Sequence, residues 1–259
     1  MNFLFGLLTL LIFAIFGTTA KSDPANVLYY DYRIEQKVQF ERRNFTQGLE
    51  IHSGRLYVSS GLYGQSALRV YDFPSMKLNK EVPIDNRIFA EGLTIIDDQL
   101  ILLSWRERIM LFYELPDLKL IGKSQLPLEG WGATHDDSTL WFSDGSNHLY
   151  FADMSGDGQL QILPVTLNGK PLRNLNELEW VEGEIWANLW QTDQIARIDP
   201  DTGIVAGIID LAGLLNPFDR HQETDVLNGI ARDPATGHIW VTGKRWPWIY
   251  RIELKTKDF

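Results

Sequence analysis

The sequence predicts an all-β fold, a five-bladed β-propeller whose last blade is closed by an N-terminal strand. Three observations indicate it: short alternating apolar runs rich in Val, Ile, Tyr and Trp, 21 glycines and nine tryptophans in 259 residues, and one order of segments that recurs five times. β-Branched and aromatic residues favour strands, and glycine favours the turns between them. A repeat of about 40 to 50 residues is typical of propeller blades.

Each repeat opens with a strand-entry segment, and the five segments are FTQGL from Phe45, FAEGL from Phe89, GWGAT from Gly130, LNELE from Leu175 and LNGIA from Leu227. A second strand with period-2 alternation follows each of them, and these strands begin at Arg55, Gln99, Thr139, Glu184 and His238. A third strand comes next in every repeat. The pattern therefore predicts five similar blades.

The stretch VLYYDYRIEQKVQF, residues 27–40, precedes the first repeat and has the composition of a strand. The fifth repeat has no room for an outer strand, because its third strand is followed almost at once by Phe259. We expect the N-terminal stretch to supply that strand, which joins the first and last blades and removes an open sheet edge. Residues 27–259 are therefore expected to form a single propeller domain.

The first twenty residues carry no charged side chain and end in Thr18, Thr19 and Ala20 ahead of a polar stretch. An apolar run followed by small residues is typical of a cleaved signal peptide. The run is also nearly long enough to remain as a membrane anchor. Either outcome predicts an extracytoplasmic protein, periplasmic or secreted, and cleavage predicts no stable association with the membrane.

The charge and the lack of cysteine exclude several functions. The formal net charge is -10, with acidic residues scattered along the chain and no basic stripe, which argues against nucleic acid as a partner. Without cysteine the chain has no disulfide, no zinc thiolate and no cysteine nucleophile. No phosphate-binding glycine loop and no G-x-S-x-G elbow is present, which disfavours nucleotide chemistry and serine hydrolysis.

No metal site is predicted from the sequence. The five histidines show no ligand spacing, so a histidine-based zinc site is not expected. Asp153, Ser155 and Asp157 are spaced like the start of a calcium loop, but Pro164 stands where a bidentate Glu is needed. A hairpin turn is the better interpretation of this segment.

Alignment of the repeats on their second strands places Gly48, Gly92, Gly132 and Glu177 at one equivalent position. The preceding residues form a first ring, which consists of Gln47, Glu91, Trp131, Asn176 and Asn228. A second ring consists of Gly61, Trp105, Gly145, Trp190 and Lys244. We expect both rings at one mouth of the central channel, with the glycines leaving space for a ligand. Glu91 alone among them can carry a proton near neutrality, and tryptophan surroundings would raise its pKa.

The motifs FTQGL, FAEGL, GWG, NELEW, WANLWQTD, DVLNGIA and TGKRWP resemble the corresponding segments of the plant-type and bacterial glutaminyl cyclases. The resemblance covers residues 40–254 and follows the same order through every blade. It implies a glutaminyl-peptide cyclotransferase, an acyltransferase that converts the N-terminal glutamine of peptides or proteins to pyroglutamate with release of ammonia. It implies no required cofactor, and it leaves open a structural calcium ion near the channel.

The resemblance also implies roles for individual residues. The position of Glu91 matches the family's presumed general acid and base, and the residues that match the lining of the family's site are Phe45, Gln47, Phe89, Trp105, Trp131, Asn176, Trp190 and Lys244. We assign catalysis to Glu91, with an oxyanion stabilised by Lys244, Asn176 or Gln47. Substrate binding is assigned to the five aromatic residues of that set.

Structural alternatives stay open for several of these residues. Phe45 and Phe89 could buttress the strand entries, Gln47 and Asn176 could cap backbone groups in their turns, and Glu91 and Lys244 could form a structural ion pair. Asn228 is expected to be structural. The rival function is a non-catalytic propeller that binds a peptide or a sugar at a tryptophan-lined channel mouth, because a fold by itself does not fix a function.

Overall fold

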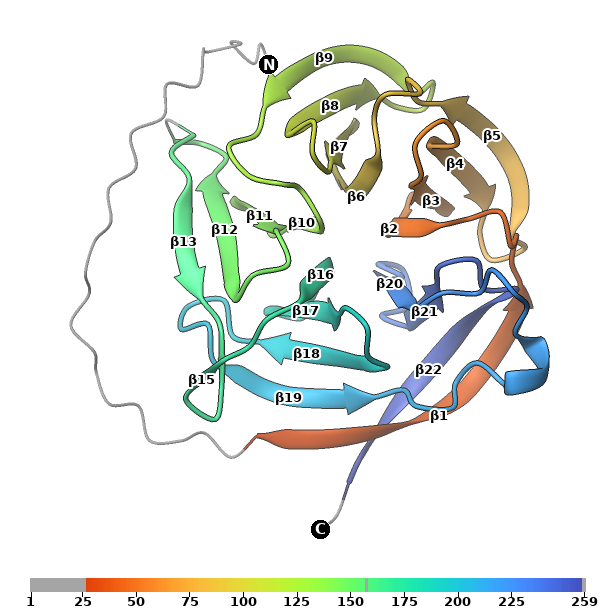
Figure 1. The fold of residues 1–259 in the computed structure, drawn as a ribbon, viewed down its shortest axis with the longest axis vertical. Coiled ribbons are helices and arrows are strands. Elements are labelled where there is room, and N and C mark those ends of the chain that lie inside the picture. The colour runs from red at the N-terminus through yellow and green to blue at the C-terminus, as the bar shows by residue number, and fades with distance from the viewer. Residues whose placement is uncertain (1–26, 157, 258–259) are drawn as a thin grey trace.

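The computed structural model describes residues 27–156 and 158–257, and the leader predicted at residues 1–20 lies outside them. Apart from one 3-10 turn, Pro217–Asp219, the regular structure of the described residues consists of strands. The sheets are arranged around a central axis, with the innermost strand of each sheet nearest to it (Figure 1). Within the described part of the chain, no helix is long and apolar enough to span a membrane.

Five four-stranded blades follow one another along the chain, as predicted. Blade 1 consists of β2 (Thr46–His52), β3 (Arg55–Ser60), β4 (Ala67–Asp72) and β5 (Lys77–Pro83), and blade 2 of β6 (Ala90–Ile96), β7 (Gln99–Ser104), β8 (Ile109–Glu114) and β9 (Lys119–Gln125). Blade 3 consists of β10 (Ala133–His135), β11 (Thr139–Ser143), β12 (His148–Asp153) and β13 (Gln161–Pro164). Blade 4 consists of β16 (Leu175–Val181), β17 (Glu184–Leu189), β18 (Gln194–Ile198) and β19 (Val205–Asp210). Blade 5 consists of β20 (Leu227–Arg232), β21 (Ile239–Gly243), β22 (Trp248–Thr256) and β1 (Leu28–Gln39). A small hairpin, β14 (Thr166–Leu167) and β15 (Lys170–Pro171), connects blades 3 and 4.

The hydrophobic core lies between neighbouring blades. The inner strands β2, β6, β16 and β20 are almost wholly buried, whereas the outer strand β5 alternates between exposed and half-buried residues. One cluster joins Tyr57 and Leu68 of blade 1 to Leu93 and Leu100 of blade 2. Because successive strand residues point to opposite faces, each blade buries one apolar set against each neighbour.

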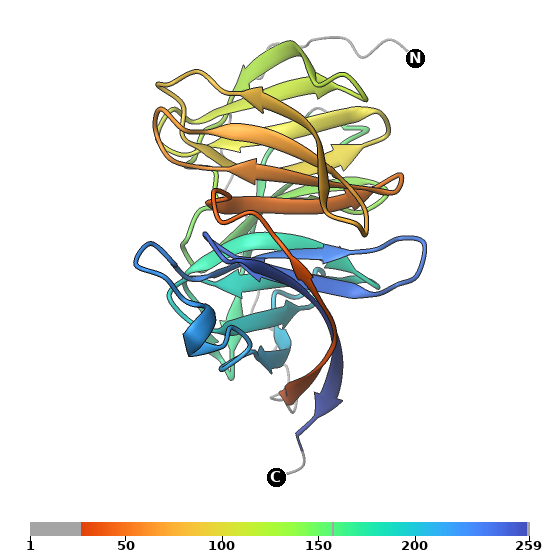
Figure 2. The same ribbon diagram turned by 90° about the vertical axis from the view of Figure 1, so that its right-hand side faces the viewer.

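The N-terminal strand closes the ring, which confirms the predicted closure. From Tyr30 to Gln39, β1 pairs antiparallel with β22 (Figure 2). The start of the same strand, Leu28–Tyr30, also pairs in parallel with Gly207–Ile209 of β19. This second pairing was not expected, and it joins blades 4 and 5 into one eight-stranded sheet.

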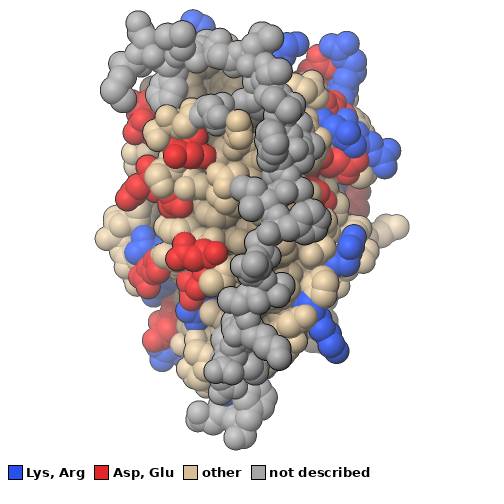
Figure 3. Space-filling model, turned by 90° about the vertical axis from the view of Figure 1, so that its left-hand side faces the viewer, with Lys and Arg blue, Asp and Glu red and all other residues tan. Residues whose placement is uncertain are grey.

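Charged side chains of both signs are interspersed over the side of the molecule drawn in Figure 3, and its visible described part carries no continuous basic patch. A protein that binds the nucleic-acid backbone needs a concentrated basic surface. The view agrees with the scattered acidic charge of the sequence.

Removal of residues 27–40 should give insoluble protein, because β22 and β19 would then present unpaired backbone groups to other chains. The measurement is the soluble fraction after expression, followed by thermal melting of any soluble material. A soluble truncation that melts cooperatively would show that β1 is dispensable for closure.

Candidate active site

A backbone irregularity presents the first ring of side chains. The pairing of the innermost strand with its neighbour shifts register between Thr46 and Gly48 in blade 1, and between Ala90 and Leu93 in blade 2. Blades 4 and 5 have the same shift, and it falls in every case at the ring residue, namely Gln47, Glu91, Asn176 or Asn228. A bulge re-aims the side chain that it carries. The strands therefore direct these residues away from the ladder.

Blade 3 departs from the predicted pattern. The segment GWGAT was expected to begin a strand at Gly130, but β10 begins only at Ala133. Gly132 lies against the next blade so closely that an added Cβ would stand 2.1 Å from the carbonyl oxygen of Asn176. The innermost segments thus meet backbone to backbone near the axis, and a side chain at this position would separate them.

One cavity of about 220 Å³ lies at this mouth of the channel. Its lining consists of Phe45, Gln47, Phe89, Glu91, Trp105, Trp131, Asn176, Trp190, Asp225 and Lys244. All nine residues predicted for the site are in this list, and they come from all five repeats of the chain. Their roles in a reaction stay predictions, whereas their convergence on one cavity is observed.

Aromatic rings form most of the cavity walls. Phe89 contacts Trp105 and Phe45 edge-on, with ring centroids 5.5 and 6.4 Å apart. Trp131 and Trp190 pack edge-on with centroids 5.4 Å apart. Edge-to-face packing of this kind holds each ring in place and keeps water away from the polar groups between them.

The prediction that Gly61 and Gly145 leave space for a ligand was wrong. A Cβ added to Gly61 would lie 2.5 Å from the ring of Phe89, and one added to Gly145 would lie 2.6 Å from the ring of Trp131. The space above each glycine is therefore filled by an aromatic side chain of the site. The glycines shape the cavity indirectly, because the lack of a side chain allows these two rings to approach the backbone closely.

Glu91 is a carboxyl group removed from water. Its residue is 6% exposed, and burial raises its pKa well above the ordinary value. The positive charge of Lys244 opposes this shift, whereas the negative charges of Glu107 and Glu129 add to it. No hydrogen bond with another described side chain occupies the carboxyl group. Burial therefore favours the neutral form of Glu91.

Lys244 lies on the opposite side of the cavity and is equally enclosed. Burial lowers its pKa, and the charges of Glu91 and Asp225 partly offset that effect. Its ammonium nitrogen lies 5.1 Å from the centre of the Phe45 ring, in a cation–π contact. Glu91 and Lys244 influence each other electrostatically, but the described residues do not include an ion pair between them. The structural ion pair considered from the sequence is therefore not formed.

Buried polar groups that lack protein partners mark this cavity as a binding site. Asn176 is 2% exposed, and its side-chain amide makes no hydrogen bond with the described residues. The indole nitrogen of Trp131 also finds no acceptor among them. Together with Glu91 and Lys244, Asn176 places N–H donors and a carboxyl in the lining of the cavity. Buried polar groups are normally paired, so such a set is typical of a site that a ligand completes.

The remaining first-ring residue is structural, as predicted. Asn228 is fully buried and donates its amide to the carbonyl oxygen of Thr46 at 3.0 Å, which joins blade 5 to blade 1. It also approaches the amide oxygen of Gln47 at 3.4 Å, leaving the amide nitrogen of Gln47 free to donate.

Sequence reasoning missed three acidic residues near the cavity. Asp225 lines it and acts on Lys244, and its place at the head of the DVLNGIA motif was a signal that we did not use. Glu129 accepts the indole N–H of Trp105 at 2.8 Å. Glu107 accepts the backbone N–H of Phe89 at 3.2 Å and the hydroxyl of Tyr63 at 2.9 Å. Glu107 follows Trp105 by two residues and Glu129 precedes Trp131 by two, and no other repeat has an acidic residue at either place.

The far end of the channel holds a separate group of carboxyls. The innermost strands run from the cavity toward this end, so Glu50 follows Gln47 and Glu179 follows Asn176 along them. Glu50 accepts the backbone N–H of Ile95 at 2.8 Å, and Glu179 accepts that of Arg232 at 2.6 Å. Burial raises the pKa of both groups, that of Glu50 to about 8.

A calcium ion needs several convergent oxygen ligands. Among the described residues, no three His, Asp or Glu side chains converge as metal ligands. In the segment that begins at Asp153, that carboxylate accepts the N–H of Ser155 at 2.7 Å, as in a turn, and Asp157 lies outside the described residues. We derive no step through a metal ion.

Residues 7–254 match the family model described as glutamine cyclotransferase. The chain belongs to the glutamine cyclotransferase family. It is 39% identical over 218 residues to a glutaminyl-peptide cyclotransferase of Arabidopsis thaliana, an alignment that covers 82% of this chain and 67% of the plant protein. It is also similar to the crystal structure of the Myxococcus xanthus glutaminyl cyclase, with a TM-score of 0.82 and 33% identity over 90% of this chain and 100% of that one. The family indicated by the blade motifs and the propeller fold are confirmed.

Glu50→Gln should raise the melting temperature at pH 8 to 9 and have little effect at pH 4.5. The folded protein keeps Glu50 neutral up to about pH 8, whereas the unfolded chain ionises it above about 4.5, so its contribution to stability falls as the pH rises between these values. Thermal melting over this range checks the prediction. The control is Glu114→Gln at an exposed position. A change in melting temperature for Glu50→Gln that is the same at every pH would contradict the prediction.

Proposed function

We propose that this protein is a glutaminyl-peptide cyclotransferase that converts the N-terminal glutamine of peptides or proteins to pyroglutamate and releases ammonia. The observation that carries the proposal is the buried Glu91 carboxyl, which shares an aromatic-walled cavity with Lys244 and Asn176 and bonds to neither. Membership of the glutamine cyclotransferase family supports the same reaction.

The size and lining of the cavity suit a single terminal residue. At about 220 Å³ it is smaller than the roughly 300 to 1,000 Å³ of pockets that hold drug-sized ligands. Aromatic rings on two sides can enclose the methylene groups of a glutamine side chain and favour the bent conformer that brings its two ends together. The rest of the peptide then extends outward through the channel mouth.

The reaction is an intramolecular aminolysis. The neutral α-amine attacks the γ-carboxamide carbon, a carbon–nitrogen bond forms, and the bond to the side-chain nitrogen breaks as ammonia leaves. The attacking amine loses one proton and the departing nitrogen gains one, so a single group that exchanges a proton is sufficient. We assign this exchange to Glu91. Its pKa is raised, and a carboxyl with a raised pKa can both accept and donate a proton near neutral pH.

Negative charge develops on the carboxamide oxygen during the attack. Lys244, Asn176 and Gln47 line the cavity and carry N–H groups, and any of them can donate to that oxygen. The low polarity of the surroundings strengthens such a bond relative to water. The same surroundings keep water from competing with the amine.

Glu91→Gln should lower kcat for ammonia release from a Gln-initiated dipeptide by about 10²- to 10⁴-fold, the usual worth of general acid and base catalysis. The fold should be retained, because the amide is a neutral isostere of the favoured acid form. Glu50→Gln, a buried channel carboxyl outside the cavity, is the matched control and should keep full activity.

Two outcomes would count against this assignment. Near wild-type turnover in Glu91→Gln would remove Glu91 from the proton transfer. Tight binding of the dipeptide by the wild type without release of ammonia would favour the rival function, a non-catalytic binding propeller.

We further propose that the chain is exported and that residues 1–20 are a cleaved leader, on the strength of their apolar, uncharged composition and the small residues at Thr18–Ala20. The protein recovered outside the cytoplasm should then have the intact mass of a chain that begins at Lys21. A full-length mass in the membrane fraction would indicate a retained anchor instead, and full-length protein in the cytoplasm would contradict export.

A further inference from the structure

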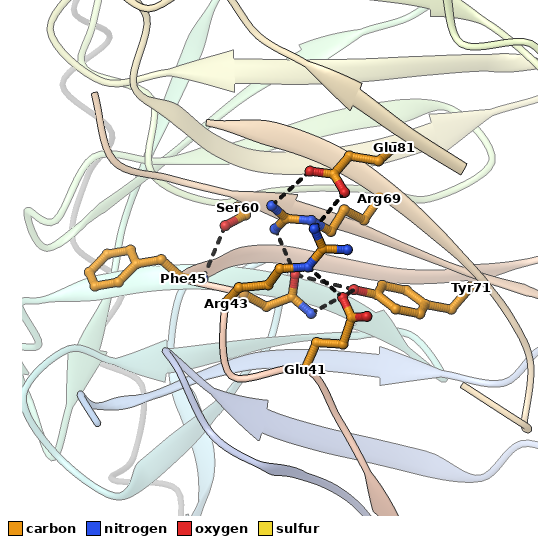
Figure 4. A network of polar contacts seen from close by, with 8 residues as sticks. Glu41, Arg43, Phe45, Ser60, Arg69, Tyr71 and Glu81 are labelled. Carbon is orange, nitrogen blue, oxygen red and sulfur yellow. Dashed lines mark hydrogen bonds and ion pairs between the residues drawn. The ribbon is translucent and has the colours of Figure 1, made fainter. Parts of the chain in front are cut away.

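A closed ring of six polar side chains lies beside the cavity in blade 1 and at its edge (Figure 4). In order around the ring, the members are Glu41, Tyr71, Asn44, Arg69, Glu81 and Arg43. Consecutive members contact one another at 2.8, 3.0, 2.8, 3.2, 2.8 and 2.8 Å, the last contact returning to Glu41. We refer to this set as the polar ring.

The charges of the polar ring balance, but breaking any of its contacts would leave buried polar groups without partners. Two arginines and two glutamates compensate each other. Asn44 is fully buried, and the side chain of Arg69 is 6% exposed. A buried guanidinium or amide that loses its partner cannot turn to water for another. The ring therefore fixes Asn44 on both sides, through the guanidinium of Arg69 and the hydroxyl of Tyr71.

Asn44 connects the polar ring to the proposed catalytic lysine. Its backbone carbonyl accepts the N–H of Arg245 at 2.7 Å, so it supports the residue directly after Lys244. Arg245 has a positive φ of 60°, a conformation that a non-glycine residue holds only when its surroundings enforce it. The lysine thus projects into the cavity from a backbone bend that Asn44 helps to hold.

The same segment also carries a wall of the cavity. Phe45, the residue after Asn44, donates its N–H to the hydroxyl of Ser60 at 3.0 Å (Figure 4). Its backbone carbonyl accepts the N–H of Gly61 at 2.9 Å. Its ring lies below the ammonium of Lys244. One short segment therefore fixes both the lysine and the aromatic ring on which it rests.

We propose that the polar ring is a positioning device for the reaction, with Asn44 and Arg69 as positioning residues that act on Lys244 through the backbone of Arg245. None of the ring members lines the cavity, so the effect reaches the substrate only through Lys244 and Phe45. This inference rests on the proposed function. It predicts that opening the polar ring impairs turnover more than substrate binding, because the other aromatic walls remain in place.

Four variants test the proposal. Asn44→Ala removes the side chain that belongs to the polar ring and keeps the backbone carbonyl that accepts the N–H of Arg245, and Tyr71→Phe opens the ring while its aromatic ring stays packed on Phe40. Arg69→Met removes the buried charge, whereas Arg69→Lys keeps a charged donor toward Asn44. The control is Arg197→Met in blade 4, which removes a two-bonded ion pair with Glu184, at 2.7 and 3.0 Å, that is remote from the cavity lining. Each is assayed at a temperature at which its melting curve shows a fully folded protein.

The expected result is a fall in kcat on the order of 10- to 100-fold for Asn44→Ala, the size of effect that a small misplacement of a catalytic group produces. KM for a Gln-initiated dipeptide should change little, and the pH profile of kcat should shift. Tyr71→Phe should also lower kcat and shift its pH profile in the same direction. It provides the test if Asn44→Ala does not fold. Arg69→Lys should recover part of the activity that Arg69→Met loses.

The control separates positioning from stability. Arg197→Met should lower the melting temperature and leave kcat and its pH profile as in the wild type. If the folded polar-ring variants match that control in kcat and pH profile, the positioning role is overturned while the proposed function stands. If the wild type itself releases no ammonia, the proposed function fails, and the inference fails with it.

Discussion

Backbone pairing between β1 and β22 is the constraint on which the site depends. Phe45 and Gln47 begin blade 1, whereas Lys244 follows β21 in blade 5, so the two groups lie on opposite sides of the junction at which the ring of blades closes. The pairing of β1 and β22, continued by the hydrogen bond from Phe40 to the carbonyl of Pro247 at 2.8 Å, holds these blades together. The cavity therefore depends on the closed ring, because its lining combines residues from both sides of the junction.

Within the closed ring, desolvation sets the chemistry of the cavity. Burial favours the neutral forms of both Glu91 and Lys244, and their mutual attraction favours the charged forms. Because the two groups do not form an ion pair, neither side chain is a direct partner of the other. The negative charges of Glu107 and Glu129 further favour the neutral form of Glu91. Between the two groups, the cavity thus offers a carboxyl and an amine that do not pair with each other.

Much of this arrangement could be predicted from the sequence, because the repeat fixes a register and the register fixes which side chains share a ring. Residues such as Glu91 and Asn176 occupy equivalent places in blades that are far apart in the chain, and pseudo-symmetry brings them to one mouth. The parallel pairing of Leu28–Tyr30 with β19 could not be predicted, because a three-residue contact leaves no periodic pattern. Arg69 and Asn44 look like ordinary surface residues in the sequence, and only the fold shows that they turn inward. The space beside Gly61 and Gly145 was misassigned because a pattern of small residues does not reveal which neighbour fills the gap.

The antiparallel partnership of the first and last strands also bears on how the molecule is made. During synthesis β1 is made before the strands of the blades, but its main partner belongs to the final blade. The strand therefore has no antiparallel partner while the first four blades form. Contacts between such distant parts of a chain are slow to form because a long loop must close. A strand left unpaired for that interval is exposed to neighbouring nascent chains. Folding of this propeller is therefore expected to end, not begin, at its N-terminus, and the functional cavity is the last part of the molecule to take shape.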